Sequence, residues 1–323
     1  MVSLFAGAGG LDLGFKQTGG FRTVWANDND PDAVSTFSSN FDVSAKLGDI
    51  RSISSSEIPD CDVVIGGFPC QGFSVANTGR RVDDARNALY LEMLRVVRDK
   101  RPLAFVAENV KGLKQMAKGE VLRRILDDFR ELGYDVQYQL VNAADYGVPQ
   151  RRERVIIVGT RADEGITFNF PDATHSPQGG NGKSRWITSG EALSEIPDPD
   201  SDNDLLNHTY SRYKLRFNGY IGNRSVDPDL PAPTVTGRGD NRGGVVVLHH
   251  PSNTRRMSVR ELATIQSFPL DFYFSCNQSA AYRLIGNAVP PALGNAVGGA
   301  LLRALSDALV VPDSDVKTYA FAG

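Results

Sequence analysis

Cys70 is the residue in this sequence whose setting best suits chemistry. It follows an apolar run at residues 63–65, two glycines, Phe68 and Pro69. Proline fixes its own φ and favours an extended residue before it, so the backbone sets the position of the thiol. A thiolate held in this way can act as a nucleophile. An isolated cysteine at a strand end is more often a small apolar side chain, so its neighbours must decide between the two interpretations.

A glycine-rich turn near the N-terminus has the pattern of a cofactor site. Residues 2–5 are predicted to form a short buried strand that runs into a turn at residues 6–10 and then a helix. Glycines in such a turn let the backbone approach a ligand closely. The dinucleotide-binding fingerprint is broken, because Asp12 stands where its third glycine should be. A tight structural turn therefore remains an alternative interpretation.

Two aspartates favour the cofactor interpretation. Asp28 follows a strand predicted at residues 21–26, about 20 residues after the glycines, where a carboxylate can bind ribose hydroxyls. Asp49 ends a third short element and could reach an adenine amino group. Alone, each aspartate is more often a cap or turn residue. Because they stand at successive strand ends, we expect them to line a cofactor pocket.

Acidic and basic side chains accompany the later strands. Glu108 comes directly after an apolar strand predicted at residues 103–107, at the same sheet edge as Cys70 if the strands are parallel. An arginine-rich stretch at residues 151–154 precedes another buried strand at residues 155–159. Such arginines usually lie on the surface or in ion pairs. Here they would also face the pocket and suit an anionic or carbonyl-bearing ligand.

The elements that position these residues indicate an α/β fold. Strands alternate with helices to about residue 160, which predicts a doubly wound, Rossmann-like sheet. From Pro171 onward, Pro, Gly, Ser, Asn and Asp accumulate, and regular periodicity is lost until Ser258. We therefore predict a catalytic and cofactor-binding domain at residues 1–170 and a smaller, irregular domain at residues 171–257. A C-terminal segment at residues 258–323 would return to the first domain.

The composition narrows the class of protein. The chain has 323 residues, a formal net charge of −3 and three cysteines, which make no disulfide framework. No apolar run reaches membrane-spanning length, no signal-peptide pattern is present, and no Cys/His cluster has zinc-site spacing. Residues 208–260 nevertheless hold nine basic and three acidic residues, a net charge of +6. That segment is either a solvated face or a surface that binds nucleic acid. The few cysteines and the lack of a signal peptide indicate a cytoplasmic protein.

Six short motifs, in order along almost the whole chain, resemble those of the cytosine-C5 DNA methyltransferases. The first resembles the S-adenosylmethionine-binding motif of that family, and the next three resemble its nucleophile, acidic and arginine motifs. The last two resemble its ninth and tenth motifs. The six lie at residues 5–10, 68–71, 108–110, 150–154, 260–269 and 286–291. Their shared order makes a coincidental match very improbable.

The resemblance implies methylation of cytosine at C5. Cys70 would add to C6 of a cytosine flipped out of the duplex, and Glu108 would hydrogen-bond N3 and the exocyclic amine. Arg154 would contact the base O2, and Arg152 the nearby DNA backbone or loop. C5 would take the methyl group from S-adenosylmethionine, a base (expected to be water) would remove the C5 proton, and elimination would free Cys70.

The resemblance also implies binding residues, and no metal ion. The S-adenosylmethionine site would comprise Phe5, Ala6, Gly7, Gly9, Leu11, Asp28, Asn29, Asp49, Ile50, Pro69, Asn287 and Ala288. Residues 171–257 would be the target-recognition domain for double-stranded DNA, and the loop at residues 71–86 would close over the flipped base. DNA contacts would come from Gln71, Ser74, Arg80, Arg81, Arg238 and Arg242. The family often has Glu where Asp28 stands, and the shorter side chain should reach less far.

Further expectations concern partners and packing. The resemblance implies a monomer in the cytoplasm, associated with the nucleoid, that could be paired with a restriction endonuclease. Thr234 and Val235 resemble a small recurring feature of the family's recognition domain. The first strand starts almost at Met1, so the final helix, predicted from Ala292, is expected to cover that edge.

Three other functions stay open. A tRNA cytosine-C5 methyltransferase of the same superfamily would keep the chemistry, although the middle region lacks the Cys-Phe-Thr tripeptide typical of that branch. A catalytically inactive DNA-binding protein is disfavoured by the presence of Cys70, Glu108 and Arg154 together. A nicotinamide-dependent oxidoreductase is disfavoured by the broken glycine fingerprint.

Overall fold

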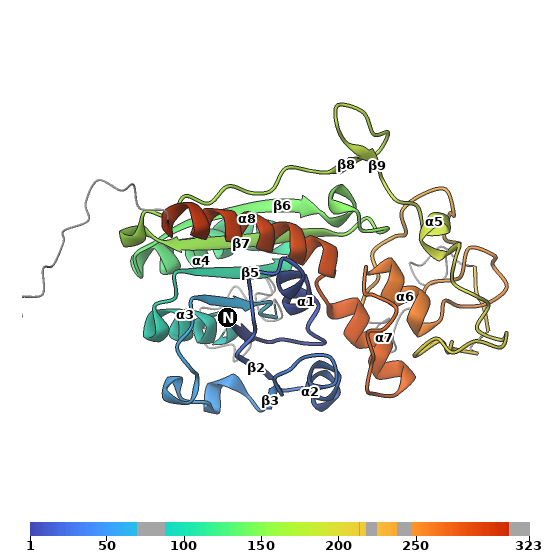
Figure 1. The fold of residues 1–323 in the computed structure, drawn as a ribbon, viewed down its shortest axis with the longest axis horizontal. Helices are drawn as coiled ribbons and strands as arrows, with labels where there is room; N and C mark the ends of the chain where they lie inside the picture. Colours follow the sequence, from blue (N-terminus) through green and yellow to red (C-terminus); the bar gives the residue numbers. More distant parts are fainter. Residues whose placement is uncertain (70–87, 213, 218–224, 238–246, 310–323) are drawn as a thin grey trace, which may run out of the picture.

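The computed structural model describes residues 1–69, 88–212, 214–217, 225–237 and 247–309. These residues form a layered α/β unit with a smaller, irregular unit beside it (Figure 1). The predicted nucleophile and the predicted DNA contacts lie outside the described residues: Cys70, Gln71, Ser74, Arg80, Arg81, Arg238 and Arg242. In the described part of the chain, no helix is long and apolar enough to cross a membrane.

A seven-stranded sheet forms the centre of the larger unit, in the order β3-β2-β1-β4-β5-β7-β6. The strands are β1 (Val2–Leu4), β2 (Trp25–Asp28), β3 (Lys46–Leu47), β4 (Val63–Gly66), β5 (Ala104–Val110), β6 (Tyr134–Asn142) and β7 (Glu153–Arg161). The first five are parallel, whereas β7 runs antiparallel to both β5 and β6. The strand order reverses between β1 and β4, and ligands of open α/β sheets bind beyond the carboxyl ends of the strands at such a point.

The sheet confirms the predicted α/β class, but two predicted strands differ in extent. Residues 21–24 precede the second strand, since β2 begins at Trp25. β5 continues through Glu108 to Val110, because it pairs with β7 along its whole length, as far as Val110 opposite Arg154. Glu108 therefore lies within a strand, where pairing with Ile156 of β7 fixes its position more firmly than a loop would.

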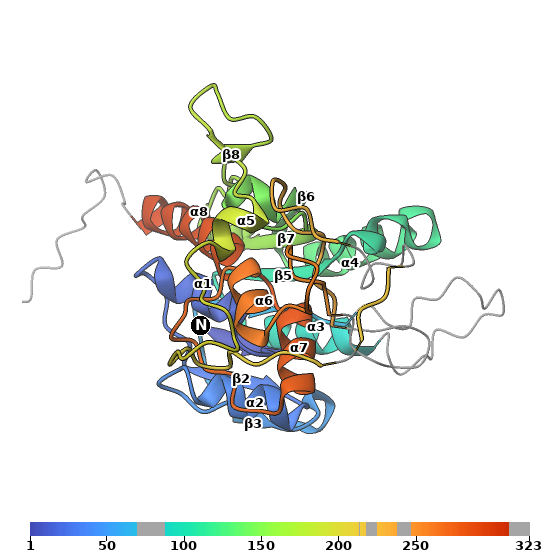
Figure 2. The same ribbon diagram turned by 90° about the vertical axis from the view of Figure 1, so that its right-hand side faces the viewer.

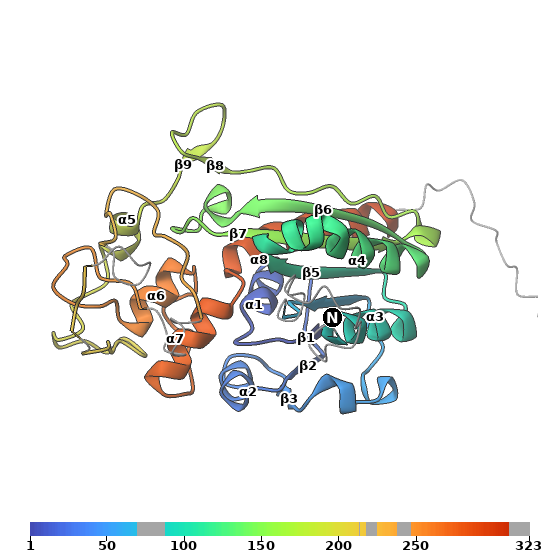
Figure 3. The same cartoon turned by 180° about the vertical axis from the view of Figure 1, so that it is seen from behind.

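Helices cover both faces of the sheet (Figures 1 and 3). α1 (Gly10–Gln17) and α8 (Pro291–Leu309) lie on one face, α3 (Ala88–Lys100) and α4 (Glu120–Glu131) lie on the other, and α2 (Pro31–Ser38) follows β2. Successive side chains of β5 point to opposite faces of the sheet, so the strand contributes to both cores. Val106 packs in the core that contains Phe15, and Phe105 stacks on Phe129 in the other core. Each such buried side chain stabilises the fold by about 1.5–3 kcal/mol. α8 shares a core with Met1, whereas Val2 and Leu4 of β1 face the other core, so cover of the first strand by α8 stays a prediction.

Short 3₁₀ segments connect these elements. They are η1 (Ile50–Ser52), η2 (Ser55–Glu57), η3 (Lys111–Gly119), η4 (Ala143–Tyr146) and η5 (Ala162–Glu164). η1 and η2 form the connection between β3 and β4, and η3 directly follows β5. Both connections leave the carboxyl edge of the sheet, the edge at which a ligand is expected.

The smaller unit is largely irregular, as the composition of residues 171–257 predicts (Figure 2). It contains the strand pair β8 (His175–Ser176) and β9 (Ser184–Arg185) and the helices α5 (Ser189–Leu193), α6 (Val259–Ile265) and α7 (Gln278–Asn287). The predicted capping box starts α6, with Ser258 accepting from the amide of Glu261. α7 was not predicted, because its ten residues carry only a short apolar stripe, and its start depends on Asn277 accepting from the amide of Ala280.

The predicted division at residues 170 and 257 stays a prediction. The packing places α6 and α7 in one core with Val235 and Leu248 of the irregular segment. α8 instead packs on the sheet, with Leu293 and Leu301 in the core of the larger unit.

Asp12, the residue that breaks the glycine fingerprint, is a buried carboxylate beneath α1. Its side chain is 1% exposed and accepts hydrogen bonds from Ser3 Oγ at 2.8 Å and Thr23 Oγ1 at 2.9 Å. Burial raises the pKa of the Asp12 carboxyl from 3.8 to about 6, although both hydroxyls oppose the rise. Keeping the Asp12 carboxyl ionised in the folded protein therefore costs free energy. The two hydrogen bonds lower this cost but do not remove it.

This arrangement predicts that Asp12→Asn stabilises the protein above pH 6. A folded-state pKa above the unfolded value adds stability that is complete below pH 4 and lost as the pH rises through 6. The shift corresponds to about 3 kcal/mol at most, and the neutral amide should recover about 1–3 kcal/mol of it at pH 7.5. Urea unfolding from pH 4 to 8 measures this. The control is Asp42→Asn, whose carboxylate is 96% exposed. A destabilised Asp12→Asn protein with an unchanged pH dependence would contradict this account.

Candidate active site

A cavity of about 530 Å³ opens at the carboxyl ends of β1, β2, β4 and β5. Its volume lies within the range of small-molecule sites, about 300–1,000 Å³. Eleven of the twelve predicted cofactor residues line it: Phe5, Ala6, Gly7, Leu11, Asp28, Asn29, Asp49, Ile50, Pro69, Asn287 and Ala288. Glu108 lines the same cavity. Residues separated by more than 280 positions in sequence thus meet at one site.

Gly9 is the predicted cofactor residue that lies elsewhere. A Cβ at Gly9 would come within 2.4–2.9 Å of the rings of Phe37 and Phe41, so this glycine leaves room for those rings. Gly10 has a similar role, since a Cβ there would lie 2.2 Å from the carbonyl oxygen of Val289. Part of the glycine motif therefore serves close packing around α1, a purpose that the sequence pattern does not distinguish from ligand binding.

Asp28 joins the glycine turn to the end of β2. Its Oδ2 accepts from the amide of Gly7 at 2.8 Å, and its Oδ1 accepts from the amide of Asp30 at 2.9 Å. Burial raises the pKa of Asp28, and these amides oppose the rise. Each carboxylate oxygen has a second lone pair, so the group can still accept from a ligand. Contact with ribose hydroxyls stays a prediction.

Asp49 lies on the wall of the cavity formed by η1. It accepts from the amide of Arg51 at 3.0 Å and from Arg51 Nε at 2.9 Å, and the Arg51 guanidinium lowers the pKa of Asp49. Arg95 of α3 holds the same wall, because its Nη2 donates to the carbonyl oxygens of Ile50 and Ile53. Sequence analysis missed both arginines, since neither belongs to a motif.

Glu108 and Arg154 form an ion pair at the other end of the cavity. Glu108 Oε1 lies 2.7 Å from Arg154 Nε, and both side chains are 11% exposed. The Nε–H does not point at this oxygen, and it has no hydrogen-bond partner. On the opposite side, Glu108 Oε2 would lie 3.2 Å from a Cβ at Gly67. Gly67 therefore keeps open the space beside this carboxylate.

Asn109 connects the acidic motif to the nucleophile motif. It is 3% exposed, and its Nδ2 donates to the carbonyl oxygen of Phe68 at 3.0 Å. Phe68 and Pro69 line the cavity directly before Cys70. Asn109 thus fixes the backbone that leads to the predicted nucleophile.

Arg152 is buried and bonded to backbone carbonyl oxygens. Its side chain is 1% exposed and donates to three backbone carbonyl oxygens: Nη1 to Val235 at 2.7 Å, and Nη2 to Gly286 and Ala288 at 2.9 Å each. A guanidinium enclosed in this way cannot reach a DNA phosphate without breaking these bonds. The predicted contact with the DNA backbone therefore stays a prediction, and in the described residues Arg152 positions the segment that carries Asn287.

Two glutamines extend this buried network. Gln150 Nε2 donates to Gln266 Oε1 at 2.7 Å, and its Oε1 accepts from the amide of Val235 at 2.9 Å. Gln266 Nε2 donates in turn to the carbonyl oxygen of Ile285 at 2.6 Å. Thr234 Oγ1 donates to the carbonyl oxygen of Arg151 at 2.7 Å. The arginine, ninth and tenth motifs and the Thr-Val pair therefore form one hydrogen-bonded unit.

The described residues include no group of three or more His, Cys, Asp or Glu side chains that could hold a metal ion. The predicted absence of a metal stays untested, since the observation covers only part of the chain.

Removing the side chain of Asn109 should impair the reaction more than it impairs cofactor binding. Asn109→Ala loses the bond to Phe68, so the backbone before Cys70 is free to shift. We expect kcat to fall roughly 10–100-fold, because small misplacements of a reacting group are costly. Gln137→Ala is the matched control, since Gln137 donates to the carbonyl oxygen of Phe168 at 3.0 Å, far from the cavity. A full kcat in Asn109→Ala would show that this bond does not position the site.

Comparisons with known proteins agree with the geometry. The sequence pattern of the C-5 cytosine-specific DNA methylase family matches residues 1–303. The chain is 40% identical over 314 residues to the Type II methyltransferase M.NgoFVII of Neisseria gonorrhoeae, covering 90% of this chain and 83% of that protein. It is 35% identical over 347 residues to M.BsuRI of Bacillus subtilis, covering 91% and 77%.

Solved structures share the fold. One is a prophage-encoded protein of E. coli assigned as a DNA modification methyltransferase, with a TM-score of 0.72, 25% identity and coverage of 94% of this chain and 99% of that one. The Dnmt2 methyltransferase of S. pombe has a TM-score of 0.63 at 21% identity, covering 94% and 98%, and this likeness concerns the fold alone. On the match of residues 1–303 and the 40% identity to M.NgoFVII, the chain belongs to the C-5 cytosine-specific DNA methylase family.

Proposed function

We propose that this enzyme methylates C5 of a cytosine flipped out of a specific duplex DNA sequence, through a covalent bond between Cys70 and C6. One observation carries the proposal. A single cavity has the predicted cofactor residues along most of its wall, the Glu108–Arg154 pair at one end, and Pro69, which precedes Cys70, at its side. That is the spatial order that methyl transfer to a flipped base requires.

The cavity fits S-adenosylmethionine, the methyl donor of this enzyme family. Its volume of about 530 Å³ suits a nucleoside with an amino-acid tail. Asp28 and Asp49 offer carboxylate oxygens on the wall formed by β2 and η1. A Cβ at Gly7 would meet nothing within 4 Å, so the glycine turn faces open space there. When bound, S-adenosylmethionine supplies an electrophilic methyl group.

The chain's own residues would carry out the remaining chemistry. The Cys70 thiolate adds to C6, forming the S–C6 bond and making C5 nucleophilic. Glu108 holds N3 and the exocyclic amine, with Oε2 facing the space beside Gly67, while Arg154 donates to O2. After C5 has gained its methyl group, water takes the C5 proton, the S–C6 bond breaks, and the electron pair returns to sulfur. Cys70 is thereby regenerated.

The basic middle segment is partly structural. Arg255 pairs with Glu261 at 2.7 Å, and Arg260 donates to the carbonyl oxygens of Leu206, Pro269 and Phe272. The net charge of the segment therefore overstates the charge available to DNA. Two candidates for phosphate contact are the exposed residues Lys214 and Arg216. The predicted contacts Arg238 and Arg242 are also candidates, and these two lie outside the described residues.

DNA is a better substrate candidate than tRNA. The family matched over residues 1–303 is specific for DNA cytosine, and the curated relatives described above are Type II methyltransferases. Those names support a modification enzyme that is paired with a restriction endonuclease. We further propose that the enzyme acts as a monomer on cytoplasmic, nucleoid-associated DNA.

Bisulfite sequencing of DNA from cells that express the protein tests this proposal. Cytosine methylation at a single recognition sequence is expected with the native protein. It should be absent with Cys70→Ala, which lacks the nucleophile, and reduced by at least about a hundredfold with Glu108→Gln. The charge-neutralising Asp42→Asn variant, altered far from the cavity, should methylate normally. Unmethylated DNA together with transfer of labelled methyl groups to tRNA would overturn the proposal.

A further inference from the structure

Arg283 of α7 joins the smaller unit to the start of α2. Its Nη2 lies 3.0 Å from Asp32 Oδ2 and 3.5 Å from Asp30 Oδ1, and its Nη1 also pairs with Asp30. α7 lies near α2 in both Figure 1 and Figure 2. One guanidinium thus neutralises two carboxylates that are about 250 residues away in sequence.

Asp30 is itself part of the predicted cofactor wall. It lines the cavity, its amide donates to Asp28 Oδ1 at 2.9 Å, and its own Oδ1 caps α2 by accepting from the amide of Asp32. The other oxygen of Asp28 accepts from Gly7. Contacts therefore run without a gap from Arg283 through Asp30 and Asp28 to the glycine turn.

The opposite wall of the cavity lies on the same helix as Arg283. Leu284 and Asn287 of α7, and Ala288 after it, line the cavity directly after Arg283 in sequence. Because Arg283 pairs with Asp30 of one lining segment and belongs to the helix that carries another, its ion pairs hold these two parts of the cavity wall together. Arg283 therefore affects the shape of the cavity, although it is not one of the reacting groups.

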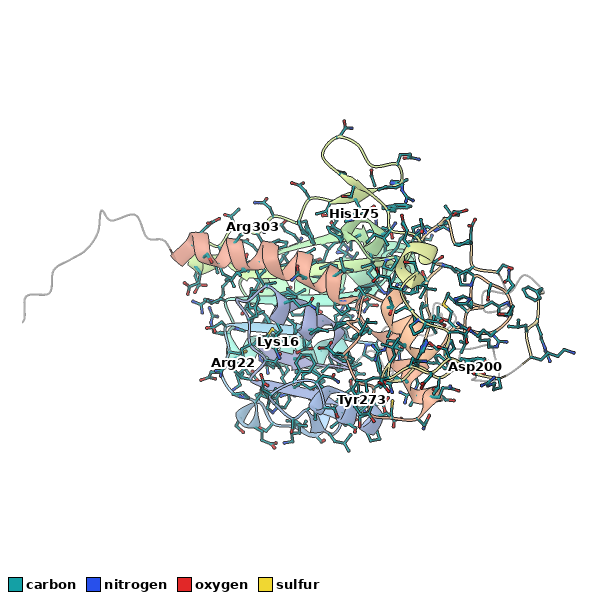
Figure 4. All side chains as sticks on the ribbon, turned by 45° about the vertical axis from the view of Figure 1, so that its right-hand side comes forward. Lys16, Arg22, His175, Asp200, Tyr273 and Arg303 are labelled. Atoms are coloured by element: carbon teal, nitrogen blue, oxygen red, sulfur yellow. The ribbon has the colours of Figure 1, made fainter. Side chains whose placement is uncertain are left out.

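Asn40, just after α2, also bonds to the smaller unit. Asn40 Nδ2 donates to the carbonyl oxygen of Tyr273 at 2.7 Å, and the amide of Tyr273 donates back at 2.9 Å; Figure 4 labels Tyr273. These bonds would keep the two units together if the Arg283 ion pairs were removed. The loss of Arg283 should therefore alter the cavity wall and leave the protein folded.

We propose that Arg283 is a positioning residue for the methyl-donor site, which sets the affinity for S-adenosyl compounds by holding Asp30 and thereby Asp28. The inference rests on the proposed cofactor site. The side chains of Arg283, Asp30 and Asp32 are 34%, 21% and 36% exposed, so each pair is partly screened by solvent. The expected loss on substitution is about three- to tenfold in affinity, or roughly 0.7–1.4 kcal/mol.

Two ligands separate positioning from simple charge. S-adenosylmethionine carries a sulfonium charge that S-adenosylhomocysteine lacks. A misplaced wall would weaken both ligands by the same factor, whereas two uncompensated carboxylates would attract only the cationic one more strongly. Equal weakening of both ligands is the signature of positioning.

The test is isothermal titration of both ligands into the native full-length protein, Arg283→Met, Arg283→Lys and Arg212→Met. Arg212 is the matched control, because it pairs with Asp200 at 2.7 Å in the smaller unit, away from the cavity (Figure 4 labels Asp200). We expect Arg283→Met to bind both ligands three- to tenfold more weakly, Arg283→Lys to recover part of the loss, and Arg212→Met to match the native protein. Thermal unfolding of each variant reports whether it is folded.

Kinetics give a second readout. With Arg283→Met, KM for S-adenosylmethionine should rise by the same factor, while kcat at saturation stays within about twofold, as expected when binding alone is affected. Unchanged affinity in a folded Arg283→Met protein, or tighter binding of S-adenosylmethionine alone, would overturn the inference. If the native protein bound neither ligand, the proposed cofactor site would fail, and the two failures are therefore distinguishable.

Discussion

The enclosed guanidinium of Arg152 is the interaction on which the rest of the site depends. It binds the carbonyl oxygens of Val235, Gly286 and Ala288, so it joins the start of β7, the smaller unit and the segment that carries Asn287. Each buried carbonyl left without a donor costs about 1–3 kcal/mol. Arg260 repeats the device with three carbonyl oxygens of its own. Two arginines whose charge would suit nucleic-acid binding thus donate to backbone carbonyl oxygens in and beside the irregular segments.

This network explains how a cavity can be built from both ends of the chain. The parallel strands bring Asp28, Pro69 and Glu108 to one edge, and a sheet with such an edge forms from local alternation of strands and helices. Asn287 and Ala288 are not placed by the strands, since Asn287 ends α7 of the smaller unit and Ala288 follows it. The hydrogen bonds from Arg152 to Gly286 and Ala288 position Asn287 and Ala288 at the cavity. The Arg283 pair closes the same junction from the side of α2.

The motifs and the alternation of strands and helices could be predicted from sequence, because apolar runs, glycine turns and polar strand ends are local signals. Eleven of the twelve cofactor residues that the family resemblance implies line one cavity. The roles of Gly9, Arg152 and Asn109 could not be predicted, since each depends on what packs against it in three dimensions. An arginine motif shows that a guanidinium is present but not where it points. The bond from Arg152 to the carbonyl oxygen of Val235 joins residues more than 80 positions apart. α7 escaped prediction because its apolar stripe is short and its cap is a single asparagine.

The central claim is that Cys70 attacks cytosine C6 in a site prepared by Glu108, Arg154 and the cofactor cavity. The most direct measurement is incubation of the protein and S-adenosylmethionine with duplex DNA in which the target cytosine is 5-fluorocytosine, followed by mass spectrometry of the trapped peptide. Fluorine at C5 blocks the elimination step, so the account predicts a stable protein–DNA adduct attached at Cys70 that Cys70→Ser does not form. An adduct at another residue, or one formed equally by Cys70→Ser, would contradict it.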